Sequence, residues 1–135
     1  MTGETIVIDA SKCVLGRVAS YAAKQALLGK KIIIVNCEEV ILTGRKKSII
    51  EEYNSARRRG GSSLKGPFFP NIPEKLVKRT IRGMLSYTKQ RGLGALKRIK
   101  CYNKILKEHE ADKKIVLTKE KKTKTIKLNE LSKRI

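Results

Sequence analysis

The chain has 135 residues, enough for one domain of ordinary size, and its 32 Lys and Arg against 12 Asp and Glu give a formal net charge of +20. A protein with this excess repels itself unless a polyanion neutralises it, so we expect a nucleic-acid partner; a solvated basic surface is the alternative. Hydrophobic residues make up 40% of the sequence but aromatic residues only 4%, without Trp, so the core must be aliphatic.

Cysteine spacing and hydropathy argue against two further classes of protein. Cys13, Cys37 and Cys101 have no C-x-x-C spacing, so we expect reduced, buried thiols and no zinc or redox site. No apolar run approaches the ~18 residues needed to span a bilayer, and the first residues lack the basic and apolar regions of a signal peptide. We therefore expect a cytoplasmic protein with no membrane partner.

The first 35 residues are typical of a strand, a helix and a second strand. Residues 5–9 are a β-branched run, and apolar residues then recur at helical spacing from Leu15 to Ala26, before a plausible C-cap at Gly29. Residues 32–35 are β-branched without polar alternation, as in a strand of a parallel sheet that is covered on both faces. This order predicts an α/β fold with a parallel crossover.

The next segment predicts a short strand, a helix and a long loop. Residues 40–42 are the third candidate strand, and a turn at 43–44 leads into a helix that carries Ile49 and Tyr53. From residue 57 to residue 71 arginine, glycine and proline follow without periodicity. Loops of this length inside domains are usually functional or disordered when unliganded.

Pro73 is suited to the first turn of another helix, whose opposite face carries Lys75, Lys78, Arg79 and Arg82. Its expected apolar stripe consists of Leu76, Val77, Thr80, Ile81 and Met84. Beyond it, Gly92 and Gly94 are expected to precede a short helical stretch, residues 99–102 to form the last strand of the core, and Asn129 to cap a terminal helical turn. We divide the chain into an α/β core at 1–103, including the basic loop 57–71, and a lysine-rich extension at 104–135.

Basic residues are concentrated between Tyr53 and Lys107, where 15 Lys and Arg face one acid, Glu74. Such a concentration is an electrostatic footprint for a nucleic acid; for any single side chain the alternative is that it is solvated. Arginine forks grip phosphate oxygens at two points and stack on bases, so we weight the arginines above the tail lysines.

Residues suited to catalysis are scarce. His109 lies among charged residues without a nucleophile signature, and no G-x-G-x-x-G or G-x-x-x-x-G-K-[ST] motif occurs. The adjacent carboxylates at 38–39 and 51–52 do not face each other on one element. We predict no active site, no metal and no cofactor.

Several short motifs follow one another along the chain: Ile8-Asp9-Ala10, Leu15-Gly16-Arg17-Val18-Ala19, Val35-Asn36-Cys37-Glu38, Thr43-Gly44-Arg45, Gly66-Pro67, Arg79-Thr80-Ile81-Arg82-Gly83-Met84-Leu85, Arg91-Gly92 and Ala95-Leu96. In order and spacing they together resemble the large-subunit ribosomal protein thirteen family, in its archaeal and eukaryotic form, from about Thr5 to Tyr102. Ser86 and the segment 103–105 depart from the family pattern.

The resemblance implies a three-layer α/β/α domain with a parallel four-stranded sheet, binding to large-subunit ribosomal RNA beside other ribosomal proteins, and a role in subunit assembly. The residues that we predict to contact RNA are Arg17, Arg45, Lys46, Lys47, Arg57, Arg58, Arg59, Lys65, Lys78, Arg79, Arg82, Lys89, Arg91, Lys97 and Arg98.

Two function hypotheses follow, of which the first is favoured. The chain is a structural constituent of the large ribosomal subunit, located on cytoplasmic ribosomes, or it is an RNA-processing enzyme on a Rossmann-like sheet. The missing glycine-rich phosphate loop separates them in favour of the first. A chromosome-coating basic protein is a third possibility.

Overall fold

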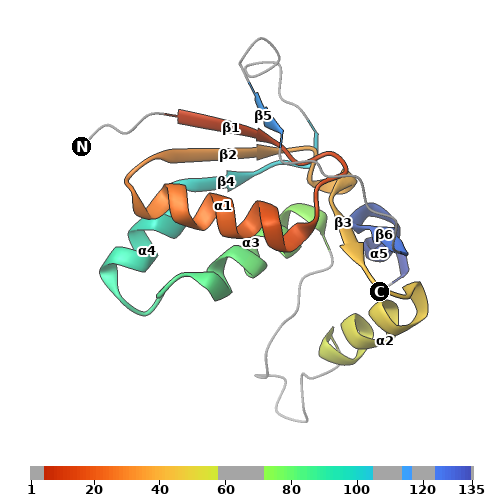
Figure 1. Ribbon diagram of the computed structural model, residues 1–135. Helices are drawn as coiled ribbons and strands as arrows, with labels where there is room; N and C mark the ends of the chain where they lie inside the picture. Colours follow the sequence, from red (N-terminus) through yellow and green to blue (C-terminus); the bar gives the residue numbers. More distant parts are fainter. Residues whose placement is uncertain (1–4, 58–71, 105–113, 117–123, 135) are drawn as a thin grey trace.

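The computed structural model describes residues 5–57, 72–104, 114–116 and 124–134 (Figure 1). Its elements in chain order are β1 (Thr5–Asp9), α1 (Leu15–Leu27), β2 (Lys31–Val35), the 3-10 turn η1 (Cys37–Glu39), β3 (Ile41–Thr43), α2 (Lys46–Arg57), α3 (Pro73–Met84), α4 (Gln90–Lys97), β4 (Ile99–Cys101), β5 (Lys114–Val116), β6 (Thr125–Lys127) and α5 (Leu128–Arg134).

The main sheet is parallel and confirms the α/β class. Its strand order is β4-β2-β1-β5. Strands β1 and β2 pair along their whole length, from Thr5 opposite Lys31 to Asp9 opposite Val35, with α1 as the connection between them. The predicted strand, helix and strand at the start of the chain are therefore confirmed.

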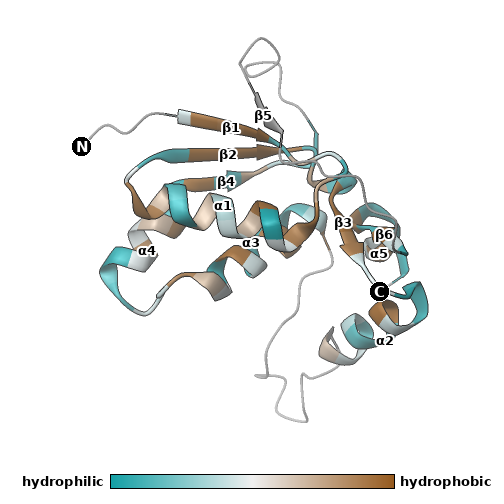
Figure 2. Ribbon diagram, in the orientation of Figure 1, coloured by the Kyte–Doolittle hydropathy of each residue, from teal (hydrophilic) through white to brown (hydrophobic). Residues whose placement is uncertain are grey.

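Helices α1, α3 and α4 cover one face of this sheet. Side chains alternate between the faces of a strand, and Ile8, Ile32, Ile34 and Ile99 are fully buried on the same face. The three helices lie together on that side (Figure 1). Strands β1 and β2 are mainly hydrophobic in Figure 2, and the helices bury apolar residues such as Val18, Ile81 and Ala95. The second helical layer of the expected three-layer arrangement is not among the described residues.

Helix α1 is the central helix of this layer because its buried face is made of small side chains. Ala19, Ala22, Ala23 and Ala26 are at most 5% exposed. Alanine favours the helix and lets neighbouring backbones approach closely. Helices α3 and α4 both contact α1, and the three pack as one layer.

Helix α3 begins at Pro73 as predicted, but one member of its expected apolar stripe was assigned wrongly. Ile81 is fully buried, whereas the side chain of Met84 is 46% exposed. The helix ends at Met84 and Leu85 adopts an extended conformation, so Leu85, at 5% exposure, takes the buried position instead. Helical spacing fails at Met84 because the helix stops there.

The strand predicted at 40–42 exists as β3 but does not join the parallel sheet. It pairs antiparallel with β6, with Leu42 opposite Ile126, in a small second sheet. Leu128 and Leu131 of α5 are fully buried beside it. These carboxyl-terminal residues belong to the packed core. Asn129 lies inside α5 and does not precede it, because the helix already begins at Leu128.

Gly92 lies within α4, which begins at Gln90, and not before the helix as expected. The glycine faces the backbone of Ser86 on the α3–α4 connection. A Cβ atom at position 92 would lie 2.1 Å from the Ser86 carbonyl oxygen, far inside van der Waals contact. Only glycine allows this approach.

Replacing Gly92 with alanine should therefore destabilise the fold. We expect Gly92→Ala to cost about 1 to 3 kcal/mol of unfolding free energy, because the α3–α4 connection must move to make room. Gly83→Ala is the matched control: it is also helical, a Cβ there meets nothing within 4 Å, and alanine should stabilise by up to about 1 kcal/mol. Urea denaturation of both variants measures the difference, and equal stability would refute the contact.

Candidate nucleic-acid interface

The carboxyl ends of the parallel strands, where α/β enzymes commonly bind their ligands, are joined here by the chain's own groups. Asp9 Oδ1, at the end of β1, accepts hydrogen bonds from Asn36 Nδ2 at 2.9 Å and from the backbone N–H of Ser11 at 3.0 Å. Asn36 has φ 58° and ψ 40°, a left-handed conformation that asparagine tolerates well. These polar side chains connect strand ends to one another.

The cysteines near these strand ends are not placed as metal ligands or nucleophiles. Cys13 and Cys37 are buried thiols, Cys101 is a half-buried thiol, and no disulfide joins these three residues. A hydrogen bond with Cys101, together with burial, raises the pKa of the Cys37 thiol far above its usual range, so this thiol stays protonated. Among the described residues no group of three or more His, Cys, Asp and Glu could hold a metal ion.

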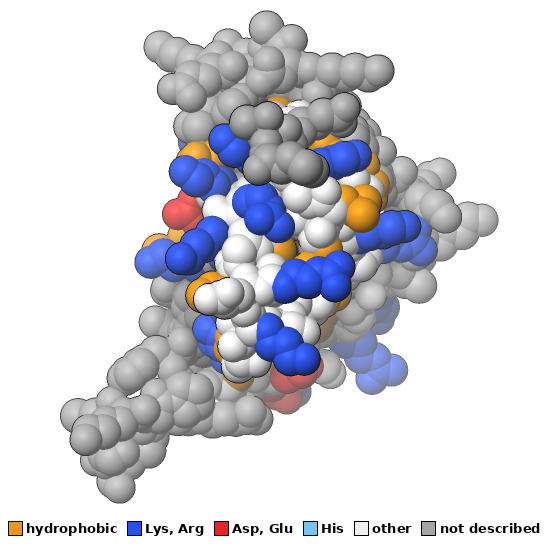
Figure 3. All heavy atoms as spheres, turned by 90° about the vertical axis from the view of Figure 1, so that its left-hand side faces the viewer, with side chains coloured by type: hydrophobic (Ala, Val, Ile, Leu, Met, Phe, Trp, Pro, Cys, Tyr) orange, Lys and Arg blue, Asp and Glu red, His pale blue; other side chains and the backbone are white. Residues whose placement is uncertain are grey.

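Exposed basic side chains gather where the last turn of α1 meets α4. We name this region the α1–α4 basic surface; it comprises Lys24, Lys89, Arg91 and Lys97, all exposed. Lys24 and Arg91 come from different helices but line the same groove. Lys and Arg side chains are spread over this side of the molecule in Figure 3.

The helices that form this surface contain no acidic residue. The sequence contains neither Asp nor Glu from residue 10 to residue 37, or from residue 75 to residue 107, so α1 and α4 carry only positive charges. The sequence did not predict Lys24 as an RNA contact, because Lys24 lies outside the basic stretch between Tyr53 and Lys107. The acid-free stretch that contains Lys24 is the signal by which it could have been found.

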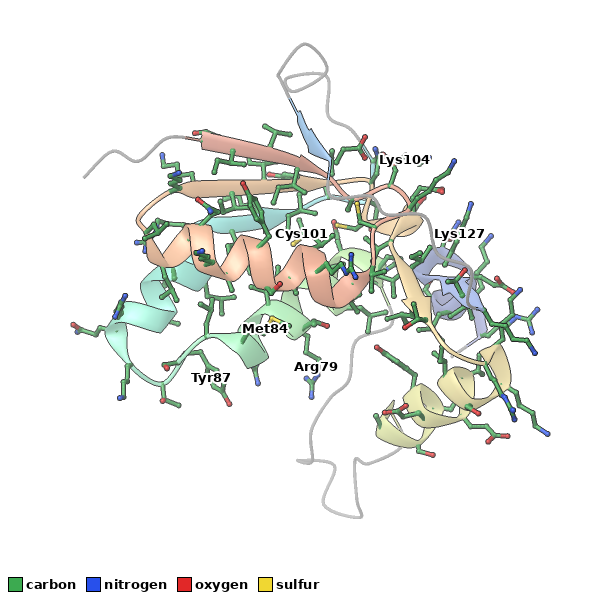
Figure 4. All side chains as sticks on the ribbon, in the orientation of Figure 1. Arg79, Met84, Tyr87, Cys101, Lys104 and Lys127 are labelled. Carbon is green, nitrogen blue, oxygen red and sulfur yellow. The ribbon has the colours of Figure 1, made fainter. Side chains whose placement is uncertain are left out.

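Arg79 and Arg82 lie three residues apart on α3 but in different surroundings. Arg82 is exposed, and its guanidinium stacks over the Tyr87 ring at 4.5 Å from the centroid. Arg79 is half-buried and, with Glu52 and Tyr53 of α2, lines a cleft of about 310 Å³ between the two helices. Figure 4 shows Arg79 and Tyr87 pointing away from the sheet. Arg82 is thus the more accessible of the two for a phosphate.

Two predicted RNA contacts, Lys78 and Arg98, have partners inside the protein. Lys78 Nζ donates to the Leu96 carbonyl at 2.9 Å and to the Ile99 carbonyl, and burial lowers its pKa. The guanidinium of Arg98 donates from Nη2 at 2.8 Å and from Nε at 3.3 Å to the carbonyl oxygen of Ala26, at the end of α1. Both side chains thus donate to carbonyl oxygens at the ends of helices and of a strand inside the protein.

The remaining predicted residues lie apart from the α1–α4 basic surface or outside the described residues. Arg17, Arg45, Lys46 and Lys47 are exposed, and Lys46 Nζ lies 3.3 Å from Glu130 Oε1. Arg57 is the last residue of α2. The rest of the basic loop 57–71, with Arg58, Arg59 and Lys65, lies outside the described residues.

Comparison with known proteins decides the family. A profile of the family described as ribosomal protein L13 matches residues 3–110. The chain belongs to the ribosomal protein L13 family. Similar curated proteins, each named large ribosomal subunit protein uL13, come from Methanosarcina barkeri (46% identical over 71% of this chain and 69% of that one), Methanococcoides burtonii (42%; 77% and 74%) and Methanocaldococcus jannaschii (44%; 96% of each).

Family membership favours the structural hypothesis over the enzyme hypothesis, because a ribosomal protein family is one of structural proteins. The matched range includes α1, α3 and α4 and therefore the whole α1–α4 basic surface. Within the described residues, no helix is long and apolar enough to cross a membrane.

Lys78 should stabilise the fold more than it binds a ligand. We expect Lys78→Met to lower the free energy of unfolding by about 1 to 3 kcal/mol, because the Leu96 and Ile99 carbonyls lose their donor. Lys97→Met removes the same charge from an exposed position of α4 and should change stability by no more than about 0.5 kcal/mol. Thermal and urea melts of both variants test this, and a Lys78 variant as stable as the wild type would contradict it.

Proposed function

We propose that this chain is a structural constituent of the large ribosomal subunit, where it binds large-subunit ribosomal RNA and supports subunit assembly on cytoplasmic ribosomes. The observation that carries the proposal is the acid-free α1–α4 basic surface on a member of the ribosomal protein L13 family. Each relative named above carries the large ribosomal subunit in its name.

The interaction is electrostatic and directed by shape. Lys24 and Lys89 supply point charges, whereas Arg91 and Arg82 supply planar forks that hold phosphate oxygens in two places. Because the charges are fixed to helices that pack on one sheet, their spacing is set before RNA binds, which reduces the entropy lost on binding. The protein thereby selects an RNA surface whose phosphates match that spacing.

Other basic segments extend this contact in the proposal. The exposed residues Arg17, Arg45 and Lys47, the basic loop 57–71 and the lysine-rich extension 104–135 add positive charge that RNA can neutralise. Neighbouring ribosomal proteins would meet exposed apolar side chains such as Ile72, which is 39% exposed. We keep residue 104 as the start of the lysine-rich extension as part of this proposal, with β5 of that extension pairing with β1 and Leu128 and Leu131 packing in the core. We also keep the three-layer arrangement around the parallel sheet.

Salt dependence tests the RNA contact. The affinity for ribosomal RNA should fall steeply with salt, because each neutralised phosphate contributes roughly 0.7 to 0.9 to the log–log slope. The double variant Lys24→Gln/Arg91→Gln should therefore lower the slope by about 1.4 to 1.8. Lys127→Gln is the matched control, because Lys127 Nζ already pairs with Glu39 Oε2 at 3.1 Å, and its slope should stay near that of the wild type.

Sedimentation tests the assembly. The protein should co-migrate with large subunits in cell extract and leave them only at high salt, and the double variant should leave at lower salt. A protein that stays at the top of the gradient, or a slope that the double variant does not change, would contradict the proposed function.

A further inference from the structure

A groove with an apolar floor and a basic rim lies between α1, the end of α3 and α4. Its volume is about 530 Å³, within the range typical of small-molecule sites. The floor and the rim are formed by Ala23, Leu27, Leu28, Met84, Lys24 and Arg91.

The floor of this groove is exposed although it is apolar. Leu28 is 62% exposed and Met84 is 46% exposed, so both leave apolar surface in water. A Leu and a Met side chain held open at the same groove favour an occupant with a flat apolar face.

The rim of the groove determines the charge of that occupant. Lys24 stands on the α1 side and Arg91 on the α4 side, and both are exposed. The three helices that form the walls carry no acid apart from Glu74, which lies in the first turn of α3, ten residues before Met84. Within these three helices no acidic side chain lies beside the rim to neutralise it, so we expect the occupant to bring the negative charge.

We propose that this groove receives an unpaired nucleotide of RNA, with the base against Leu28 and Met84 and the flanking phosphates on Lys24 and Arg91. The inference rests on the proposed function and adds the form of RNA that the surface selects. An unpaired nucleotide exposes a flat apolar base between two phosphates, whereas a paired duplex hides its base faces in the stack. The charge complementarity of the rim favours this occupant over a protein segment, which would need an acidic sequence.

The affinity of the full-length protein for two RNA probes tests the proposal. One probe is a short RNA duplex with a single bulged adenosine, and the other is the same duplex fully paired. The wild type should bind the bulged probe about 5- to 140-fold more tightly, the range that contact with one base gives.

A double variant identifies the groove as the source of the preference. Leu28→Gln/Met84→Gln removes the apolar floor without changing charge, and both positions are exposed, so the melting temperature should be preserved. It should lose the preference for the bulged probe and keep the affinity for the paired one. Leu93→Gln is the matched control, because Leu93 is 42% exposed on α4 but does not line the groove; this variant should keep the preference.

A second measurement does not depend on the variants. With 2-aminopurine at the bulge, binding of the wild type should change the fluorescence as the base enters the groove, and excess fully paired duplex should not reproduce the change.

The possible results separate the inference from the function on which it rests. Equal affinity of the wild type for both probes overturns the groove assignment and leaves RNA binding intact, whereas binding of neither probe overturns both. The double variant could also discriminate between the probes like the wild type and yet enter the large subunit poorly. That result would assign the groove to a protein segment and overturn the proposal that a nucleotide occupies it.

Discussion

Close packing of α1 against the sheet and against α3 is the contact on which the other features depend. An aliphatic core with few aromatic residues has to gain its stability from many short side chains that fit tightly. The buried alanines of α1, from Ala19 to Ala26, allow that fit. The same approach brings Lys24 of α1 beside Arg91 of α4, so the geometry of the basic surface follows from the core.

The high net charge is divided between two tasks. Lys78 and Arg98 are half-buried and satisfy carbonyl oxygens at the ends of helices and at the outer edge of β4. Lys78 of α3 thereby also occupies a hydrogen-bonding group of the edge strand β4, and such groups are those through which sheets associate. Lys24, Arg91 and their neighbours remain exposed. Thus a count of basic residues overestimates the charge that is available to a ligand.

The sequence predicted local elements better than their partners. β-Branched runs and helical spacing identified β1, β2 and α1, because those signals lie within a few residues of chain. Nothing near Ile41 indicates that its strand pairs with residues 125–127, and the end of α3 at Met84 depends on a turn that no periodicity marks. Asn103 is another residue whose partner the sequence did not indicate. It departs from the family pattern, yet its Oδ1 accepts a hydrogen bond from the Glu74 N–H at 3.0 Å at the start of α3.

The sequence predicted that the candidate site is basic, but not how its residues are arranged in space. Charge between Tyr53 and Lys107 pointed to RNA, and membership of the L13 family agrees with that reading. The inner roles of Lys78 and Arg98 could not be inferred, because their acceptors are backbone carbonyls on other elements. Lys24 could not be grouped with Arg91, because only the packing of α1 on α4 brings these residues together.

The hydrogen bonds from Arg98 to Ala26 join residues 72 positions apart and thereby impose an order on folding during synthesis. While the chain is being translated, α1 emerges from the exit tunnel long before the guanidinium that closes its last turn. β3 likewise waits for β6, and Leu128 and Leu131 fill the core later still. The nascent protein therefore keeps its apolar surfaces open until residues 126–131 are released, and its basic helices reach their final spacing only after translation has passed them.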